Sequence, residues 1–137
     1  MSELVSQLTT GFWNIETPNG TFHSIPINDE DFNFQEFNEI ETVYNILDRR
    51  EIEGKINAIT LWDKEYTESL ALLISGLENN YEDSNKHYLF SLSPDTAKRI
   101  NGAPRLTDYG HYLNQFLPKL ISIGCYICEV ECRDFDC

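Results

Sequence analysis

The sequence predicts an α+β fold, or an α/β fold, in which a mixed central sheet of about five strands packs with three or four helices. Three observations support this prediction. The length of 137 residues is that of one domain, so residues 1–137 are expected to form a single globular domain. Hydrophobic residues make up 41% of the chain and aromatic residues 12%, which is enough to build a core. Stretches with β-like alternation and stretches with helical spacing follow one another in mixed order.

The first predicted elements are two β-prone stretches, residues 11–15 and 21–27. The Thr-Pro-Asn-Gly segment at 17–20 separates them, and its Asn-Gly pair supplies the positive φ angles of a tight turn. A β-hairpin is therefore expected here. Pro26 has no backbone N–H donor, so the second strand is expected to lie at a sheet edge or to end there.

A helix is expected from about Phe34 to Arg50, because apolar residues recur there at helical spacing and Gly54 follows as a stop. The acidic side chains near the start of this helix and the two arginines at its end both suit the helix dipole.

The middle of the chain predicts two strand–helix pairs. Residues 55–62 are apolar enough for a strand inside the sheet, and Asp63 can then cap a helix that carries an apolar face from Tyr66 to Leu77. Residues 87–92 are again β-like, and Ser-Pro-Asp at 93–95 predicts a short helix that ends at Gly102.

The last predicted helix begins at Thr107, where apolar residues recur at spacings of three and four. Pro118 is expected to kink or divide this helix, and Gly124 to end it. Residues 125–132 alternate as a final strand before an acidic tail.

The net charge is the strongest global signal. Ten Lys and Arg residues stand against 23 Asp and Glu residues, which gives a formal charge of −13. Such a chain repels phosphate backbones, so no nucleic acid is expected as a partner. The same field attracts a basic protein, although a net negative charge also serves simply to keep a protein in solution.

The acidic residues are densest between residues 29 and 53, where nine acids face two bases and aromatic residues stand among them. If the aromatic side chains turn inward and the acids outward, this segment presents a carboxylate surface backed by a core. The alternative is an ordinary solvated helix face. The carboxylates expected to contact a basic partner are those of Asp29, Glu30, Asp31, Glu36, Glu39 and Glu41.

No catalytic signature stands in the sequence, so an enzyme is not expected and no catalytic residue is assigned. The histidines at 23, 87 and 111 are scattered and form no helical metal pair. The seven glycines form no phosphate-binding loop, and no cofactor is expected. A small enzyme with a cleft near His87 or His111 remains an alternative.

Four cysteines fall in the last 13 residues, as Cys125-x2-Cys128-x3-Cys132-x4-Cys137. Thiolates at such spacing could hold zinc, yet structural zinc sites usually draw ligand pairs from two separate elements. Alternation along one strand would also point Cys125 away from Cys128 and Cys132. No metal site is therefore assigned, while free thiols, a bound metal and a disulfide all stay open.

No segment has the length and apolarity of a membrane span, since the longest apolar run is the five residues from Leu70 to Ile74. No basic start followed by an apolar stretch marks a signal peptide. No membrane partner is expected, and a cytoplasmic location is predicted.

A small, acidic α+β chain without a catalytic signature resembles the immunity proteins that neutralise bacterial polymorphic toxins, including those of contact-dependent growth inhibition systems. The resemblance is one of overall character and carries no family residue to a position in this chain. It implies a stoichiometric inhibitor that binds a cognate toxin domain, commonly a basic nuclease. The alternative function is a small metal-binding or protein-interaction module that uses the C-terminal cysteines. The oligomeric state is not predicted.

Overall fold

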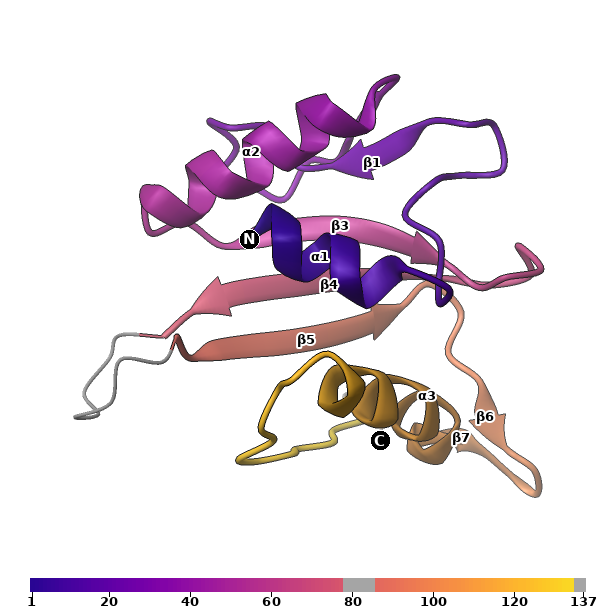
Figure 1. The fold of residues 1–137 in the computed structure, drawn as a ribbon. Coiled ribbons are helices and arrows are strands. Elements are labelled where there is room, and N and C mark those ends of the chain that lie inside the picture. The colour runs from indigo at the N-terminus through magenta and orange to yellow at the C-terminus, as the bar shows by residue number, and fades with distance from the viewer. Residues whose placement is uncertain (78–85, 135–137) are drawn as a thin grey trace. The chain divides into compact units, whose positions relative to one another are not determined.

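The computed structural model describes residues 1–77 and 86–134 (Figure 1). Contacts along the chain define two compact units, Met1–Asp95 (unit 1) and Thr96–Cys137 (unit 2). Each unit is built differently and is described by itself below. That residues 1–137 act as a single globular domain stays a prediction.

Unit 1 is built on a five-stranded sheet in the order β2-β1-β3-β4-β5. Every strand pair in it is antiparallel, so the α+β class is confirmed, whereas the expected mixed sheet is wrong. A turn at 63–68 joins β3 to its antiparallel neighbour β4, whereas the connection from β2 to β3 contains the helix Ile40–Ile52 and crosses β1. The strands are β1 (Phe22–Ser24), β2 (Gln35–Phe37), β3 (Asn57–Trp62), β4 (Ser69–Gly76) and β5 (Tyr88–Pro94).

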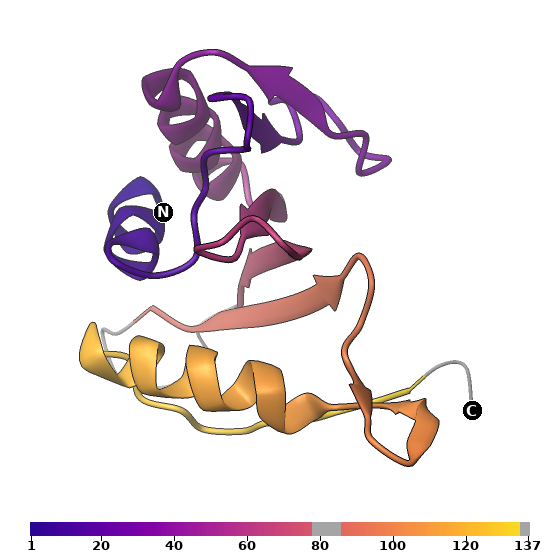
Figure 2. The ribbon, with the colours of Figure 1, turned by 90° about the vertical axis from the view of Figure 1, so that its right-hand side faces the viewer.

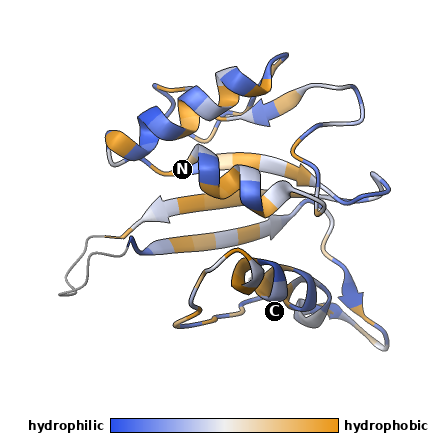
Figure 3. Cartoon of the chain, viewed as in Figure 1, coloured by the Kyte–Doolittle hydropathy of each residue, from blue (hydrophilic) through white to orange (hydrophobic). Residues whose placement is uncertain are grey.

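Two helices, α1 (Ser2–Thr9) and α2 (Ile40–Ile52), cover one face of this sheet (Figures 1 and 2). Alternate residues of β4 are buried against that face, while their neighbours on the other face are half-buried. Hydrophobic residues recur along β3, β4 and β5 (Figure 3). The buried apolar side chains of the helices and of β4 are Val5, Leu8, Val43, Ile46, Leu47, Leu70, Leu72 and Ile74.

A buried arginine joins α2 to two loops of unit 1. Arg50, in the last turn of α2, is 3% exposed. Its Nε donates to the carbonyl oxygen of Ile56 at 2.9 Å, and its Nη1 lies 2.9 Å from each of three carbonyl oxygens of the segment 26–29. Because the guanidinium donors are fixed in a planar fork, this one side chain sets the position of both loops relative to the helix.

Glu51 links α2 to the start of β5. Its carboxylate accepts hydrogen bonds from Tyr88 Oη at 2.8 Å and from Lys86 Nζ at 3.2 Å, and the Met1 ammonium lies 2.6 Å away. Burial raises the pKa of this carboxyl, but the hydrogen bonds from Met1, Tyr88 and Lys86 outweigh burial, so the pKa is lowered. The ionised carboxylate therefore stabilises the folded state.

Unit 2 contains a two-stranded sheet and one helix. β6 (Arg99–Ile100) pairs with β7 (Ala103–Thr107), and α3 (Tyr109–Ser122) follows, with the Asp108 side chain accepting from the His111 N–H at its start. The segment after α3 runs back along the helix (Figure 2), and the Asp134 carboxylate accepts from Thr107 N at 2.8 Å and Thr107 Oγ1 at 2.7 Å. These two bonds lower the pKa of Asp134 and fasten the end of the described chain to β7.

The expected helix 34–50 is correct only from residue 40. Residues 35–37 form β2 instead, because their backbone pairs with β1 in the register Phe22↔Phe37 and Ser24↔Gln35. The two arginines do stand in the last turn of α2, and Gly54 follows its end with a φ of 70°. Pairing with β1 thus overrides the helical spacing of Phe34 and Phe37.

Two further expected helices are wrong. Residues 69–76 form β4, and Asp63 caps a tight turn by accepting from the backbone N–H groups of Thr67 and Glu68. The run from Leu70 to Ile74 is apolar at successive positions, so its period does not separate a buried helix from a central strand. The short helix expected over 93–102 is also absent from the structure, because β5 continues to Pro94 and β6 follows.

The ends of the chain also differ from expectation. α1 was not expected, and the described part of the predicted C-terminal strand, residues 125–132, has no regular secondary structure. The turn at 17–20 is confirmed, with Gly20 at a φ of 77°, but the hairpin around it is reduced to the single bridge Glu16↔Phe22. β1 lies between β2 and β3 rather than at an edge, but it ends at Ser24, before Pro26, so the alternative prediction that the strand ends there is confirmed.

The predicted strands 55–62 and 87–92 are confirmed as β3 and β5, and the helix expected after Thr107 is confirmed as α3. Pro118 lies inside α3 and does not divide it. Among the helices of residues 1–77 and 86–134, none combines the length and apolar character needed to cross a bilayer.

We expect Arg50→Met to lower the free energy of unfolding by about 3 kcal/mol, because four carbonyl oxygens of the two loops lose the hydrogen bonds of the buried guanidinium. The matched control is Arg49→Met, since Arg49 is exposed and forms an i,i+4 ion pair with Glu53 on the helix surface. That change should cost about 0.5 kcal/mol or less. Urea unfolding of both variants measures the difference, and equal losses would show that the buried fork does not hold the loops.

We expect the wild-type chain to lose stability as the pH falls below about 4.5, because the folded-state pKa of Glu51 lies below its unfolded value. The stabilisation is complete above the unfolded pKa and disappears as the pH falls through the folded pKa. Glu51→Gln should therefore be less stable at about pH 7 and lose less on acidification. Urea unfolding across this range tests it, with Glu65→Gln, at an exposed loop position, as the control.

Candidate functional site

The net negative charge of the chain belongs to one of its two units. Unit 1 contains 18 of the 23 acidic residues and five of the ten basic ones, so the full formal charge of −13 belongs to it. Unit 2 has five acidic and five basic residues and is formally neutral. Any attraction for a basic partner therefore originates from unit 1.

The loop between β1 and β2 is held in a tight conformation by its own carboxylate. Asp29 accepts hydrogen bonds from the backbone N–H of Asp31 at 2.8 Å and of Asn33 at 2.5 Å. Phe32 lies between these two anchored residues with a φ of 57°, in the left-handed region that non-glycine residues seldom adopt. The strain is maintained by the hydrogen bonds on either side of it.

Two aromatic side chains of this loop face outward. Phe32 is 44% exposed and Phe34 is 38% exposed, so the condition that the aromatic residues of the acidic segment turn inward is not met by these two. Phe37 and Tyr44, farther along the segment, are half-buried. Partly exposed aromatic side chains provide apolar contact area of the kind that is enriched at interface centres, while carboxylates beside them suit the polar rim of an interface.

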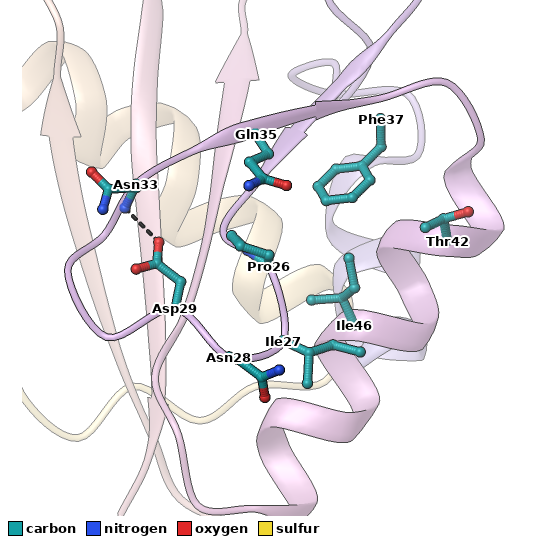
Figure 4. Close-up of a pocket in the computed structure, with 9 residues that line it drawn as sticks. All are labelled: Pro26, Ile27, Asn28, Asp29, Asn33, Gln35, Phe37, Thr42 and Ile46. Carbon is teal, nitrogen blue, oxygen red and sulfur yellow. Dashed lines mark hydrogen bonds between the residues drawn. The ribbon is translucent and has the colours of Figure 1, made fainter.

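A pocket of about 610 Å³ opens between this loop, β2 and α2 (Figure 4). Among the lining residues in the described part of the chain, the one charged group is the carboxylate of Asp29, which accepts hydrogen bonds from the loop backbone. Its apolar lining residues are Pro26, Ile27, Phe37 and Ile46. Its uncharged polar lining residues are Asn28, Asn33, Gln35 and Thr42.

Four of the predicted carboxylates follow the two sides of this pocket. Glu30 and Asp31 lie in the loop between the lining residues 29 and 33, and Glu39 and Glu41 lie at the turn into α2 between the lining residues 37 and 42. Figure 4 shows these two segments on opposite sides of the pocket. All four side chains are exposed. We call Glu30, Asp31, Glu39 and Glu41 the acidic rim.

The structure separates the other two predicted carboxylates from the rim. Asp29 lies in the pocket wall, where its carboxylate accepts hydrogen bonds from the loop backbone. Glu36 stands on β2 between two pocket-lining residues, so alternation along the strand directs it to the other face of the sheet. There it accepts a hydrogen bond from Thr21 Oγ1. Of the six predicted positions, four lie beside the pocket.

Sequence reasoning did not find the pocket. Its lining comes from three segments, 26–29, 33–37 and 42–46, that are brought together by the β1–β2 pairing and by the packing of α2. The amide residues Asn28, Asn33 and Gln35 formed no motif by themselves. The one available signal was their density in a loop flanked by acids, which is also typical of ordinary turns.

The C-terminal cysteines form no ligand cluster within the described residues. Cys125 is half-buried, Cys128 and Cys132 are exposed, and all three are free thiols. Burial raises the pKa of the Cys125 thiol, which disfavours the thiolate that a metal requires. No group of three or more potential ligands occurs in residues 1–77 and 86–134, and Cys137 lies outside the described residues.

No family model matches the chain, and comparisons with curated proteins and with solved structures also give no match. The site is therefore interpreted from its own chemistry, which combines an exposed acidic rim, two exposed phenyl rings and a pocket lined by apolar and amide side chains.

We expect Phe32→Asn to keep or raise the free energy of unfolding, by up to about 1 kcal/mol, because asparagine tolerates the left-handed region that strains phenylalanine. Phe34→Asn is the control, since Phe34 is similarly exposed and has no positive φ, and it should gain nothing. Urea unfolding compares the two. A clear loss in Phe32→Asn would mean that the ring stabilises the fold and that its exposure has no separate purpose.

Proposed function

We propose that this chain is an immunity protein that binds and neutralises a cognate basic toxin domain, such as a nuclease, through the acidic rim of unit 1. The observation that carries the proposal is the concentration of the full charge of −13 on unit 1 together with exposed phenyl rings beside the rim. The protein would act in the cytoplasm of a bacterial cell and block the toxin by occupancy rather than by catalysis.

Electrostatics supports the choice of a basic partner. Surfaces that hold phosphates are rich in Lys and Arg, and a toxin nuclease needs such a surface to bind its substrate. A rim of exposed carboxylates is complementary to that surface and speeds the encounter by long-range attraction. Carboxylates that cover the substrate-binding cations would also exclude the nucleic acid.

The exposed phenyl rings provide the apolar contacts that lengthen the lifetime of a complex, which charge alone does little to extend. Rim charges mainly set the association rate and contribute little to the lifetime of a complex, because water and salt screen them. Desolvated aromatic side chains at an interface centre slow dissociation. Phe32 and Phe34 stand in the same loop as Glu30 and Asp31, so both kinds of contact are available to one partner.

The proposal is tested by co-expressing this chain with a panel of basic bacterial toxin domains in a bacterial host. We expect growth to be rescued from one of these domains and a stable complex with that domain to be recovered. Failure of the chain to protect against, or to bind, any basic domain would contradict the proposal.

For a toxin domain that binds, we expect Glu30→Lys with Asp31→Lys to lower the association rate about tenfold at low salt and to flatten its dependence on salt. The matched control is Glu3→Lys with Glu65→Lys, which changes the charge of unit 1 equally at exposed positions away from the rim. Stopped-flow measurements at rising salt compare the two. If both double variants slow association equally, net charge rather than the rim attracts the partner.

A further inference from the structure

We propose that the pocket beside the acidic rim receives an aromatic side chain with a polar tip, a tyrosine flanked by basic residues, from the protein partner. This inference rests on the proposed function and identifies the anchor within that interface. Charge alone specifies only that the partner is basic, whereas the pocket lining specifies which side chain lies at the centre.

The lining fits an apolar body with one hydrogen-bonding end. Phe37 and Ile46, from β2 and α2, and the prolyl ring of Pro26 provide apolar contact, and aromatic rings pack well on such side chains. The amide of Gln35 points toward the pocket (Figure 4) and is able to donate and accept, so it satisfies a phenol hydroxyl there.

A cation is a poorer occupant of the pocket itself. The carboxylate of Asp29 already accepts two backbone N–H groups, and the Arg50 guanidinium holds the adjacent carbonyl oxygens of the segment 26–29. The positive charge of Arg50 opposes a second cation there. Lysine and arginine side chains are better placed outside, against Glu30, Asp31, Glu39 and Glu41 on the two sides of the pocket.

The size of the site agrees with a side chain inserted together with its neighbours. A volume of about 610 Å³ falls within the roughly 300–1,000 Å³ range of ligand sites and exceeds what one tyrosine fills. The flanking residues of the partner segment then lie over the rim, where their ammonium groups meet the carboxylates. An aromatic anchor in a central pocket with polar groups at the rim is the usual arrangement of an interface hot spot.

Three synthetic peptides test this inference: Lys-Lys-Tyr-Lys-Lys, Lys-Lys-Ala-Lys-Lys and Gly-Gly-Tyr-Gly-Gly. Binding to the full chain is followed by NMR through the backbone amides of Gln35, Phe37 and Thr42. We expect the basic tyrosine peptide to bind about tenfold more tightly than the alanine peptide and to shift the pocket amides, which the alanine peptide leaves in place.

Two tryptophan variants of α2 separate the pocket from the rim. Thr42→Trp fills the pocket and should remove the advantage of the tyrosine peptide, whereas Asn45→Trp, at an exposed position of the same helix outside the pocket lining, should preserve it. Both positions are exposed, so neither change disturbs the core.

The outcomes distinguish this inference from the proposed function. Equal affinities for the two basic peptides, with the pocket amides unmoved, would overturn the pocket and leave the acidic rim as a binding surface. Absence of binding by both basic peptides at low salt would overturn the rim. If only the neutral tyrosine peptide shifted the pocket amides, the pocket would bind tyrosine, but the proposal of a basic partner would be wrong.

Discussion

The burial of the Arg50 guanidinium is the constraint on which the candidate site depends. Burial opposes the charged form and lowers the pKa of Arg50, while the charges of Asp29, Glu53 and Glu30 act in the other direction. Carbonyl oxygens from two loops accept hydrogen bonds from the guanidinium, and the place of Arg50 in the last turn of α2 suits the helix dipole. An arginine so enclosed is stable only while both loops stay in position. The helix and the two loops therefore hold one another in place.

This arrangement gives the β1–β2 loop a fixed shape before any partner arrives. The segment 26–29 is attached to Arg50, and Asp29 then fixes the following residues up to Asn33. Phe32 is kept in a strained backbone conformation with its ring exposed. A loop ordered in advance loses little conformational freedom on binding, which favours affinity. The backbone strain at Phe32 is thus consistent with a residue retained for contact rather than for stability.

How well the sequence predicted each element depended on whether local signals agreed. In α3 the apolar spacing and the Asp108 cap both favour a helix, and the helix is present. In β4 the apolar run from Leu70 to Ile74 is compatible with a buried strand and with a helix, and only its pairing with β3 and β5 decides the outcome. Residues 35–37 have helical spacing of apolar residues, yet they form a strand because their backbone pairs with the edge of β1. Non-local hydrogen bonds decided both cases.

The sequence by itself determined the charge of −13, the acidic segment from Asp29 to Glu53 and the lack of catalytic motifs in the chain. All three are properties of composition and residue order. Only the tertiary structure decided which carboxylates lie beside the pocket. Strand alternation turned Glu36 away, the loop backbone engaged Asp29, and the packing of α2 against β2 placed the remaining four on two sides of a pocket. The pocket itself joins three segments through strand pairing and the buried Arg50, and contacts between distant residues of this kind leave no pattern in a single sequence.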